Sequence, residues 1–207
     1  MPENLYKLFV ISSPSGGGKT SLINKLFEDS RSANFEKSIS DTSRQKRQGD
    51  LEGKDYYFLS EKDFKDKIKK EEYVEYATVF GNFYGTSKEE IKTKYNNSNL
   101  ILELDWQGAY AVKELFDDAK LIFLVPPSLD DLKQRLMKRN LDSPKVIESR
   151  LSEAKKEISK SEMYDYLVLN DDFEKAFEDL SQILFEGISP IDFNSRSSKD
   201  LIKRLVE

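Results

Sequence analysis

Eight consecutive residues near the amino terminus have the types and the spacing of a phosphate-binding loop. They read Ser13-Pro14-Ser15-Gly16-Gly17-Gly18-Lys19-Thr20 and lie between the apolar run Leu8 to Ile11 and a helical pattern. Glycines let successive backbone N–H groups turn toward phosphate oxygens, and the start of a helix adds partial positive charge. In a Walker A loop the lysine reaches the β- and γ-phosphates and the hydroxyl ligates Mg²⁺. The sequence therefore predicts a nucleoside triphosphate site in which Lys19 and Thr20 have these two roles.

The loop departs from the strict pattern at its first position, where Ser13 replaces a glycine. An ordinary strand-to-helix turn rich in glycine and serine is the alternative interpretation, but it does not explain why lysine and threonine follow at once. We expect ATP to contact the whole loop and Ser21, which follows it.

A second group of residues has the chemistry of a monophosphate clamp. The segment from Ser38 to Arg47 contains Arg44 and Arg47, and Tyr56 follows shortly after. Guanidinium groups bind phosphate oxygens bidentately, and tyrosine hydroxyls can add further hydrogen bonds. A solvated basic turn is the alternative for these residues taken alone. This segment matters because a phosphate loop by itself does not separate a kinase from a GTPase or a motor.

Strands that alternate with helices must position these two groups. Four short apolar runs are predicted to be buried strands: Leu8 to Ile11, Leu100 to Leu104, Leu121 to Val125, and Tyr166 to Leu169. Helical apolar patterns follow the first and the last of them. This alternation predicts an α/β fold with a parallel sheet flanked by helices.

Two segments interrupt the alternation. The first, from Lys37 to Lys92, is rich in tyrosine and turn residues. The second, from Ser128 to about Lys160, is mostly polar, and Ser128 with Asp131 predicts a helix start. Leu129, Leu132 and Leu136 give that helix a thin apolar stripe, so we expect it to be only lightly attached to the body.

The composition limits the chemistry and the partners. The 207 residues suit one domain with inserts, and the balance of charged (34%) and hydrophobic (38%) residues is typical of a globular protein. The chain has no cysteine and no histidine, which excludes thiolate nucleophiles, histidine bases, and zinc sites with nitrogen or sulfur ligands. A net charge of −5 argues against nucleic-acid binding. With no apolar run long enough for a bilayer or a secretory signal, we expect a cytoplasmic protein that is a monomer or a small homo-oligomer.

The ordered motifs of the chain resemble those of guanylate kinases. The family patterns S-x-S-x-T-[ST]-R-x-x-R, G-x-D-Y-x-F, E-[FYW]-x-E-x-A and G-x-x-Y-G-[ST] occur in order at Ser38 to Arg47, Gly53 to Phe58, Glu72 to Ala77, and Gly81 to Thr86. The likeness continues through Glu103 to Gly108, Pro126 to Ser128, Arg135, Arg139, Arg150-Leu151, and Asn170 to Asp172, and it spans roughly residues 5–186.

The resemblance implies a P-loop kinase core with a mixed GMP-binding insert and a helical lid. We expect a core of residues 5–36, 93–127 and 161–186, an insert of residues 37–92, a lid of residues 128–160, and a peripheral tail of residues 187–207. It also implies transfer of the γ-phosphoryl group of MgATP to GMP or dGMP, with Mg²⁺ as the cofactor.

The resemblance assigns an acceptor role to a set of residues in the insert. Arg44, Arg47, Tyr56 and Tyr84 would hold the GMP phosphate, while Ser40, Glu75 and Thr86 would contact the guanine edge. Guanine offers a donor pair, N1–H and the 2-amino group, that one carboxylate can accept, and adenine lacks that pair. Taken singly, Glu75 could be a surface carboxylate and Thr86 could cap the helix near Lys88.

No general base is needed, because the accepting phosphate oxygen is already anionic near neutral pH. Catalysis then consists of alignment and charge neutralisation, which we assign to Lys19, Arg44, and the lid residues Arg135, Arg139 and Arg150. Asn140 stands where the family commonly has a glycine, so the hinge of the lid departs from the family pattern. Because lid closure should exclude water, Arg139→Ala is expected to lower turnover more than GMP binding.

Two acidic residues keep alternative roles at this stage. Asp105 ends an apolar strand, where it could hold Mg²⁺ through water, as a Walker B residue does. The resemblance alternatively places Glu103 and Asp105 near the acceptor nucleotide and its arginines. Asn170 is expected to contact adenine.

Two rival functions remain in view. A non-catalytic guanylate-kinase-like interaction module is disfavoured by the intact Lys19, Thr20 and Asp105. A kinase of another nucleoside monophosphate is disfavoured by Glu75 and Thr86.

Overall fold

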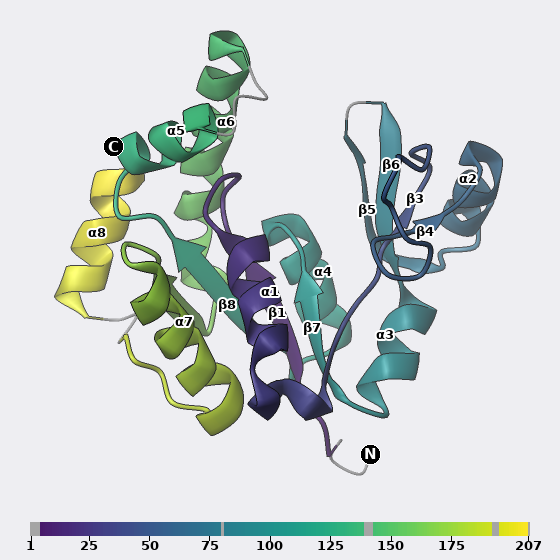
Figure 1. The fold of residues 1–207 in the computed structure, drawn as a ribbon, viewed down its shortest axis with the longest axis horizontal. Helices are drawn as coiled ribbons and strands as arrows, with labels where there is room; N and C mark the ends of the chain where they lie inside the picture. The colour runs from purple at the N-terminus through teal and green to yellow at the C-terminus, as the bar shows by residue number, and fades with distance from the viewer. Residues whose placement is uncertain (1–4, 80, 139–142, 192–194, 207) are drawn as a thin grey trace.

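The structure, a computed structural model, describes residues 5–79, 81–138, 143–191 and 195–206. Its centre is a parallel sheet, and Figure 1 shows helices on both of its faces. In the described residues this sheet has five strands, in the order β2 (Phe35–Lys37), β7 (Asn99–Glu103), β1 (Leu8–Ser12), β8 (Lys120–Val125) and β9 (Tyr166–Leu169). The predicted α/β class is confirmed, and the four predicted strands are present, while β2 is an edge strand that the sequence did not indicate.

Alternate side chains of the strands build a separate core on each face of this sheet. Leu8 and Val10 of β1 enter one core, and Phe9 and Ile11 enter the other, because successive side chains of a strand point to opposite faces. In the described part of the chain, the buried helical residues of the first core come from α3 (Lys88–Tyr95), α4 (Trp106–Leu115), α6 (Pro144–Ser159) and α8 (Arg196–Val206). The second core is covered by α1 (Lys19–Glu28), α7 (Phe173–Ser181) and the π-helical turn Gln182–Glu186. The sheet is therefore buried on both faces, as its continuous apolar strands require.

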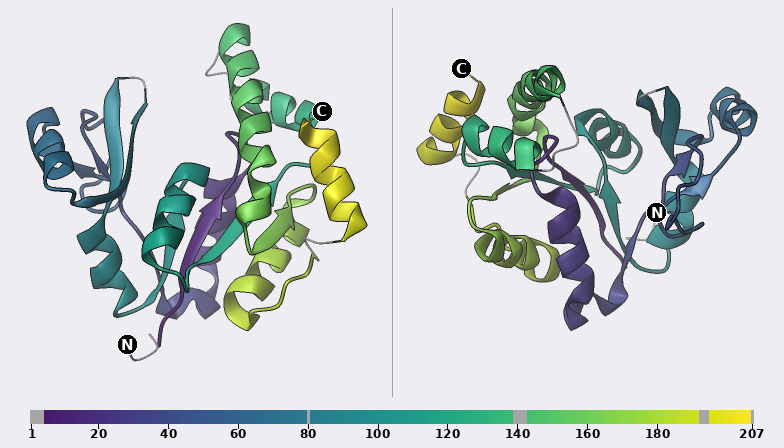
Figure 2. Two further views of the ribbon diagram at one scale, coloured as in Figure 1. Left: turned by 180° about the vertical axis from the view of Figure 1, so that it is seen from behind. Right: turned by 45° about the horizontal axis from the view of Figure 1, so that its top comes forward.

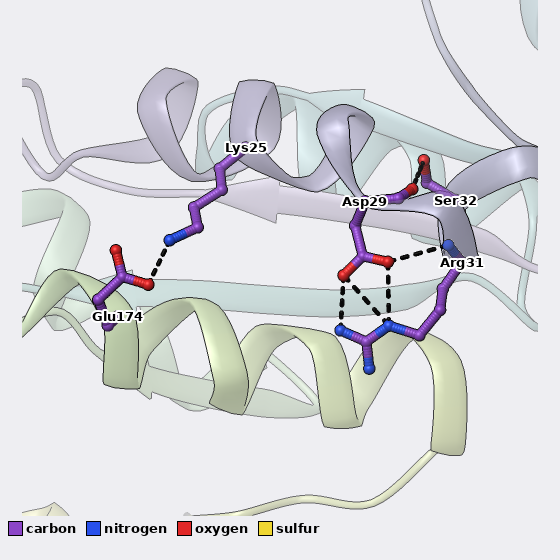
Figure 3. Close-up of polar contacts among 5 residues, drawn as sticks. All are labelled: Lys25, Asp29, Arg31, Ser32 and Glu174. Carbon is purple, nitrogen blue, oxygen red and sulfur yellow. Dashed lines mark hydrogen bonds and ion pairs between the residues drawn. The ribbon is translucent and has the colours of Figure 1, made fainter.

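The two helices of the second core are joined at their surface by a lysine (Figure 3). Lys25 of α1 pairs with Glu174 of α7, and its ammonium lies 4.9 Å from the ring centroid of Phe177. At the end of α1, Asp29 accepts a hydrogen bond from the backbone N–H of Arg31 and pairs with its guanidinium at 2.7 Å. The first pair links α1, the helix that follows the phosphate loop, to α7, and the second closes the turn after α1.

A second, smaller sheet stands beside the first (Figure 1). It is mixed, with the strand order β4 (Tyr57–Phe58), β3 (Asp41–Thr42), β6 (Asn82–Ser87) and β5 (Tyr73–Val79), and α2 (Glu61–Lys69) packs on it. Phe64 of α2 is fully buried, and its ring stacks on Tyr73 and Phe83 with centroid distances of 4.5 and 5.3 Å. An aromatic stack thus replaces the aliphatic core of the large sheet.

The segment after β8 forms two helices, α5 (Leu129–Lys138) and α6, which rise beside the phosphate loop (Figure 2). Ser128 begins α5, because its hydroxyl accepts the Asp131 N–H at 3.0 Å. The expectation of a lightly attached helix is wrong: Leu132 and Leu136 are fully buried, and a Cβ added to Gly16 would lie 3.0 Å from Leu136 Cδ2. Burial of a leucine contributes about 1.5–3 kcal/mol, so two of them attach α5 firmly to the loop.

Short 3₁₀ turns at Ser30–Asn34 and Ser161–Met163 complete the chain's regular structure in the described residues. Of the helices in that part of the chain, none combines the length and the apolar character that crossing a bilayer requires.

Candidate active site

The phosphate loop has the strand–loop–helix setting that the sequence predicted. It connects β1 to α1, and Gly18 precedes the first residue of the helix. Gly18 has a φ of 93°, and a Cβ there would lie 2.3 Å from Asn170 Nδ2, so the loop requires glycine at this position. Within the loop, the Gly17 N–H donates to the Pro14 carbonyl at 2.8 Å, and Ser13 is buried. Ser21 is exposed in the first turn of α1.

The last two residues of the loop, Lys19 and Thr20, reach the end of β7. Lys19 Nζ donates to the Leu104 carbonyl at 3.2 Å, and the Thr20 hydroxyl donates to Glu103 Oε1 at 2.6 Å. Burial lowers the pKa of Lys19, and attraction to the carboxylates of Glu103, Glu157 and Asp105 opposes that shift. The lysine is therefore held among acidic groups at the floor of the site.

Glu103 accepts the hydrogen bond from the Thr20 hydroxyl, whereas Asp105 accepts hydrogen bonds from the backbone of the helix that follows it. Asp105 Oδ1 caps α4 by accepting the N–H groups of Gln107 and Gly108 at 2.9 and 3.0 Å. Burial would raise the pKa of Glu103, but attraction to Lys19 and Lys37 outweighs it and holds that pKa below its usual range. The role of Asp105 toward a metal or an acceptor nucleotide stays a prediction.

The segment of α5 and α6 contacts the phosphate loop through Arg150, and Arg135 contacts Asn170, which itself contacts the loop. Arg150 Nη1 donates to Ser15 Oγ at 3.0 Å, and Arg135 Nη2 donates to the Asn170 carbonyl at 2.7 Å. The buried Asn170 side chain in turn donates to the Gly17 carbonyl at 2.7 Å. Asn170 thus braces the loop, and its contact with adenine stays a prediction. Arg139 and Asn140 lie outside the described residues.

The predicted acceptor residues of the insert lie on the small sheet, in the loop between β3 and β4, and just before β3. Tyr56 and Tyr84 contact each other edge to face at 5.6 Å between ring centroids. The Arg44 guanidinium lies 5.5 Å from the ring of Tyr56 and pairs with Asp50 at 2.9 Å. Arg47 is exposed. Burial raises the pKa of Tyr56, and repulsion from Tyr84 adds to that shift, so this phenol remains a donor at neutral pH.

The remaining predicted acceptor residues of the insert, the carboxylate of Glu75 and the hydroxyls of Thr86 and Ser40, are connected by hydrogen bonds. Thr86, which is fully buried, donates to Glu75 Oε1 at 2.8 Å, and the Ser40 and Thr86 hydroxyls lie 3.4 Å apart. Ser87, not Thr86, caps α3. Burial raises the pKa of Glu75, whereas the hydrogen bond from Thr86 lowers it. A Cβ on Gly108 would lie 3.0 Å from Glu75 Cγ, so glycine at the start of α4 makes room for this carboxylate.

A cleft of about 360 Å³ connects the two groups of residues. Lys19 and Thr20 line it from the phosphate loop, and Ser40 and Tyr56 line it from the insert. The remaining lining residues lie between them or at the rim: Lys37, Ser38, Lys54, Asp55 and Glu103. The structure therefore brings two predicted residues of the phosphate loop and two of the insert to one cavity, whereas Arg44, Arg47, Glu75, Tyr84 and Thr86 are not among the described residues that line it.

Two charged residues of the site were missed by reasoning from the sequence. Lys37 pairs with Glu103 at 2.7 Å, and Glu157 of α6 lies among the acidic groups near Lys19. Burial, together with repulsion from Asp105 and Glu153, raises the pKa of Glu157 to about 7, although Lys19 opposes the shift. The available signal for Glu157 was its spacing of seven residues from Arg150, which puts both on one helix face. Lys37 offered only its place directly before the Ser38 motif.

The phosphate loop follows the central strand of the parallel sheet, and the second sheet faces that loop across the cleft. This arrangement defines an α/β P-loop protein with two polar subsites. The family model for guanylate kinase matches residues 6–187. A guanylate kinase of Wolbachia sp. subsp. Brugia malayi (strain TRS) is 45% identical over 184 residues, which cover 88% of this chain and 93% of that relative.

Other relatives give the same result. A guanylate kinase of Hahella chejuensis (strain KCTC 2396) is 47% identical over 178 residues, which cover 86% of this chain and 85% of the relative. The crystal structure of guanylate kinase from Anaplasma phagocytophilum matches with a TM-score of 0.69 and 32% identity, covering 99% of this chain and 98% of the other. The chain belongs to the guanylate kinase family, which confirms the resemblance of the motifs.

Proposed function

We propose that this protein transfers the γ-phosphoryl group of MgATP to GMP or dGMP, giving ADP and GDP or dGDP, as an enzyme of purine nucleotide metabolism in the cytoplasm. The observation that carries the proposal is the shared cleft, which is lined by Lys19 and Thr20 on one side and by Ser40 and Tyr56 on the other. A triphosphate on the first side and a monophosphate on the second would meet end to end. Membership of the guanylate kinase family supports the same pair of substrates.

Selection of guanine is assigned to the set of Glu75, Thr86 and Ser40. Glu75 Oε1 accepts the Thr86 hydroxyl, which leaves the second carboxylate oxygen for the N1–H and 2-amino donors of guanine. Because Thr86 gives its proton to Glu75, Ser40 is the donor in the 3.4 Å contact between the two hydroxyls, and it would turn from Thr86 to donate to O6. Adenine would leave the second oxygen of this half-buried carboxylate without the guanine donors, which costs binding free energy. The arrangement thus favours GMP over AMP.

Transfer requires alignment and neutralisation of charge on the moving phosphoryl group. Lys19 would neutralise the β- and γ-phosphates, and Arg44, Arg47, Tyr56 and Tyr84 would hold the acceptor phosphate in line. Arg135 and Arg150 already touch the residues that shape the loop, so small movements of α5 and α6 would bring them to the phosphates. Arg139 keeps its expected role in the same segment.

The residues present fit a magnesium ion held with the nucleotide. The Thr20 hydroxyl gives its proton to Glu103, so its lone pairs are available to a hard cation that takes oxygen ligands. Thr20 would hold the ion directly, with Glu103 or Asp105 acting through water. When bound, Mg²⁺ supplies charge neutralisation between the β- and γ-phosphates.

The domain boundaries remain part of this proposal. We assign residues 37–92 to acceptor binding and residues 128–160 to the lid, on the core of residues 5–36, 93–127 and 161–186, with residues 187–207 as the tail. The retained phosphate loop favours an enzyme over an interaction module, because a module needs no Lys19 or Thr20 in a nucleotide cleft.

The direct test is ADP release with MgATP and a panel of nucleoside monophosphates. We expect GMP and dGMP to be good acceptors, and AMP, UMP and CMP to be poor ones. Equal rates with AMP and GMP would contradict the acceptor assignment. A lack of turnover with every acceptor, together with retained ATP binding, would favour the interaction module.

A further inference from the structure

Lys37 is a cation in the cleft to which no role has yet been assigned. It is the last residue of the edge strand β2, which pairs with β7 so that Lys37 lies opposite Ile101. Glu103 is two residues beyond Ile101, and side chains two apart on a strand share a face. That face is the one covered by α1, because Ile101 packs in the same core as Leu22. The register thus places Lys37, Glu103 and the start of α1 on one side of the sheet.

The side chains of these three elements form a chain of polar contacts. Lys37 Nζ pairs with Glu103 Oε2 at 2.7 Å, and Glu103 Oε1 accepts the Thr20 hydroxyl at 2.6 Å. Each carboxylate oxygen therefore serves a different partner. The side chain of Glu103 is 17% exposed and that of Lys37 is 38% exposed, so the pair is only partly screened by solvent.

The backbone of Lys37 is itself anchored. Lys94 of α3 donates to the Lys37 carbonyl at 2.8 Å and pairs with Glu90 at 2.7 Å. The Ser38 N–H donates to the Ile101 carbonyl at 2.9 Å, which continues the pairing of the two strands past Lys37. The end of β2 is thereby held on both sides, and the Lys37 ammonium approaches Glu103 from a fixed base.

The ion pair with Lys37 holds the Glu103 carboxylate in the orientation in which it accepts the Thr20 hydroxyl. Lys19 lies close enough to attract Glu103, and a carboxylate without Lys37 would be free to turn toward it. Such a turn would release the Thr20 hydroxyl and give Lys19 a protein partner in place of a phosphate. A hydroxyl whose proton is fixed presents its lone pairs in a fixed direction, as outer partners of metal ligands do.

We propose that Lys37 is a positioning residue, which acts through Glu103 to orient the Thr20 hydroxyl toward the metal of a bound magnesium–nucleotide complex. The proposal rests on the proposed function only in the role given to Thr20. This role differs from a direct contact between Lys37 and a nucleotide phosphate in two ways. It requires Glu103, and it changes only the part of nucleotide binding that depends on the metal. Partners one step beyond a metal ligand change metal affinity about 10- to 100-fold. Since Lys37 lies a further step away, we expect a change of about three- to tenfold.

Calorimetric titration of ADP, with Mg²⁺ and with EDTA in its place, tests the proposal without catalysis. The quantity compared is the magnesium-dependent ratio, which is the dissociation constant of ADP in EDTA divided by that in Mg²⁺. It is measured for the wild-type protein and for the variants Lys37→Met, Lys37→Gln, Lys37→Arg, Glu103→Gln and Lys37→Met/Glu103→Gln. Lys69→Met, which removes an exposed lysine paired with Asp66 outside the cleft, is the matched control. Thermal unfolding of each variant checks that it is folded.

We expect Lys37→Met and Lys37→Gln to lower the magnesium-dependent ratio about three- to tenfold, with little change in the binding of metal-free ADP. Lys37→Arg should restore most of the ratio, and Lys37→Met should have no further effect when Glu103 is already Gln. The proposal is overturned by an unchanged ratio, by an equal loss of metal-free binding, by an effect that persists in the Glu103→Gln background, or by a wild-type ratio near one.

Assays of GMP phosphorylation on the same wild-type sample separate the two proposals. A wild-type protein that does not phosphorylate GMP but shows the expected ratios would contradict the proposed function and support the role of Lys37. Normal phosphorylation with unchanged ratios in the Lys37 variants would do the reverse.

Discussion

The two sides of the cleft differ in how completely the protein itself holds their functional groups. On the side of the phosphate loop, side chains from distant segments fix the loop in place. Asn170 binds the Gly17 carbonyl, Arg150 binds Ser15, and Glu103 binds Thr20. Glu103 and Asn170 lie at the ends of strands whose side chains are buried on both faces, and Arg150 belongs to α6. This side is preorganised for its ligand.

On the acceptor side, the functional groups satisfy one another. Arg44 pairs with Asp50, Glu75 accepts a bond from Thr86, and Arg47 is exposed. They belong to a small sheet whose core is an aromatic stack around Phe64. If Arg44 holds the acceptor phosphate as proposed, that phosphate must compete with Asp50 for it. Under the proposed function, the difference implies that the donor binds to groups already held in place, whereas the acceptor must displace contacts within the protein.

Loss of the charge at the centre of the preorganised side should have the largest effect. Lys19→Met is expected to lower kcat by about 1,000-fold or more, because it removes charge that stabilises the moving phosphoryl group. Steady-state ADP release measures this change, and circular dichroism checks the fold. A turnover within tenfold of wild type would mean that the loop is not the catalytic side.

Loss of the carboxylate proposed to recognise guanine should have the next largest effect. Glu75→Ala is expected to reduce kcat/KM for GMP by about 100- to 1,000-fold, since each hydrogen bond to a charged acceptor contributes about 1.5–3 kcal/mol. The KM for ATP should stay nearly unchanged, because Glu75 belongs to the acceptor side. Glu89→Ala, in an exposed position of α3, is the matched control. A comparable fall with AMP as acceptor would place the defect in the fold rather than in recognition.

Release of Arg44 from Asp50 should have a smaller effect, and it should strengthen GMP binding rather than weaken it. Asp50→Asn keeps an oxygen for the Arg47 N–H but removes the charge that competes with phosphate. An ion pair near the surface contributes about 0.2–1 kcal/mol, so the Kd for GMP is expected to fall by about two- to fivefold. Titration calorimetry at low and high salt would detect this, with the gain shrinking at high salt. Weaker GMP binding would instead show that Asp50 orients Arg44.

The smallest effect concerns stability on the side of the phosphate loop. In the folded protein the pKa of Glu157 is raised from its ordinary 4.5 to about 7, so folding favours the neutral carboxyl. The stability that this neutral form contributes is present below pH 4.5 and is lost as the pH rises toward 7. Glu157→Gln is neutral at every pH and should raise Tm at pH 8 by about 2–4 °C, with little effect at pH 4.5. Thermal unfolding at both pH values measures it, and equal shifts would contradict the assignment.

Local signals in the sequence were enough for much of this molecule. The glycines of the phosphate loop, the apolar runs of β1, β7, β8 and β9, and the Ser128 cap of α5 each depend on neighbouring residues, and all were found where predicted. The strand β2 was not predicted, because three residues at a sheet edge give too short a pattern. The attachment of α5 was misjudged, because a stripe of leucines does not tell how deeply its partner surface buries it.

The sequence by itself determined that a phosphate loop precedes the first helix and that arginines, tyrosines, a glutamate and hydroxyls occur in a recognisable order. Only the tertiary structure decided their pairing. Thr20 and Glu103 are 83 residues apart, Lys37 and Glu103 are 66 apart, and Gly17 and Asn170 are 153 apart. Such contacts follow from strand order and register, which no local pattern contains, because they are fixed when the sheet buries both of its faces.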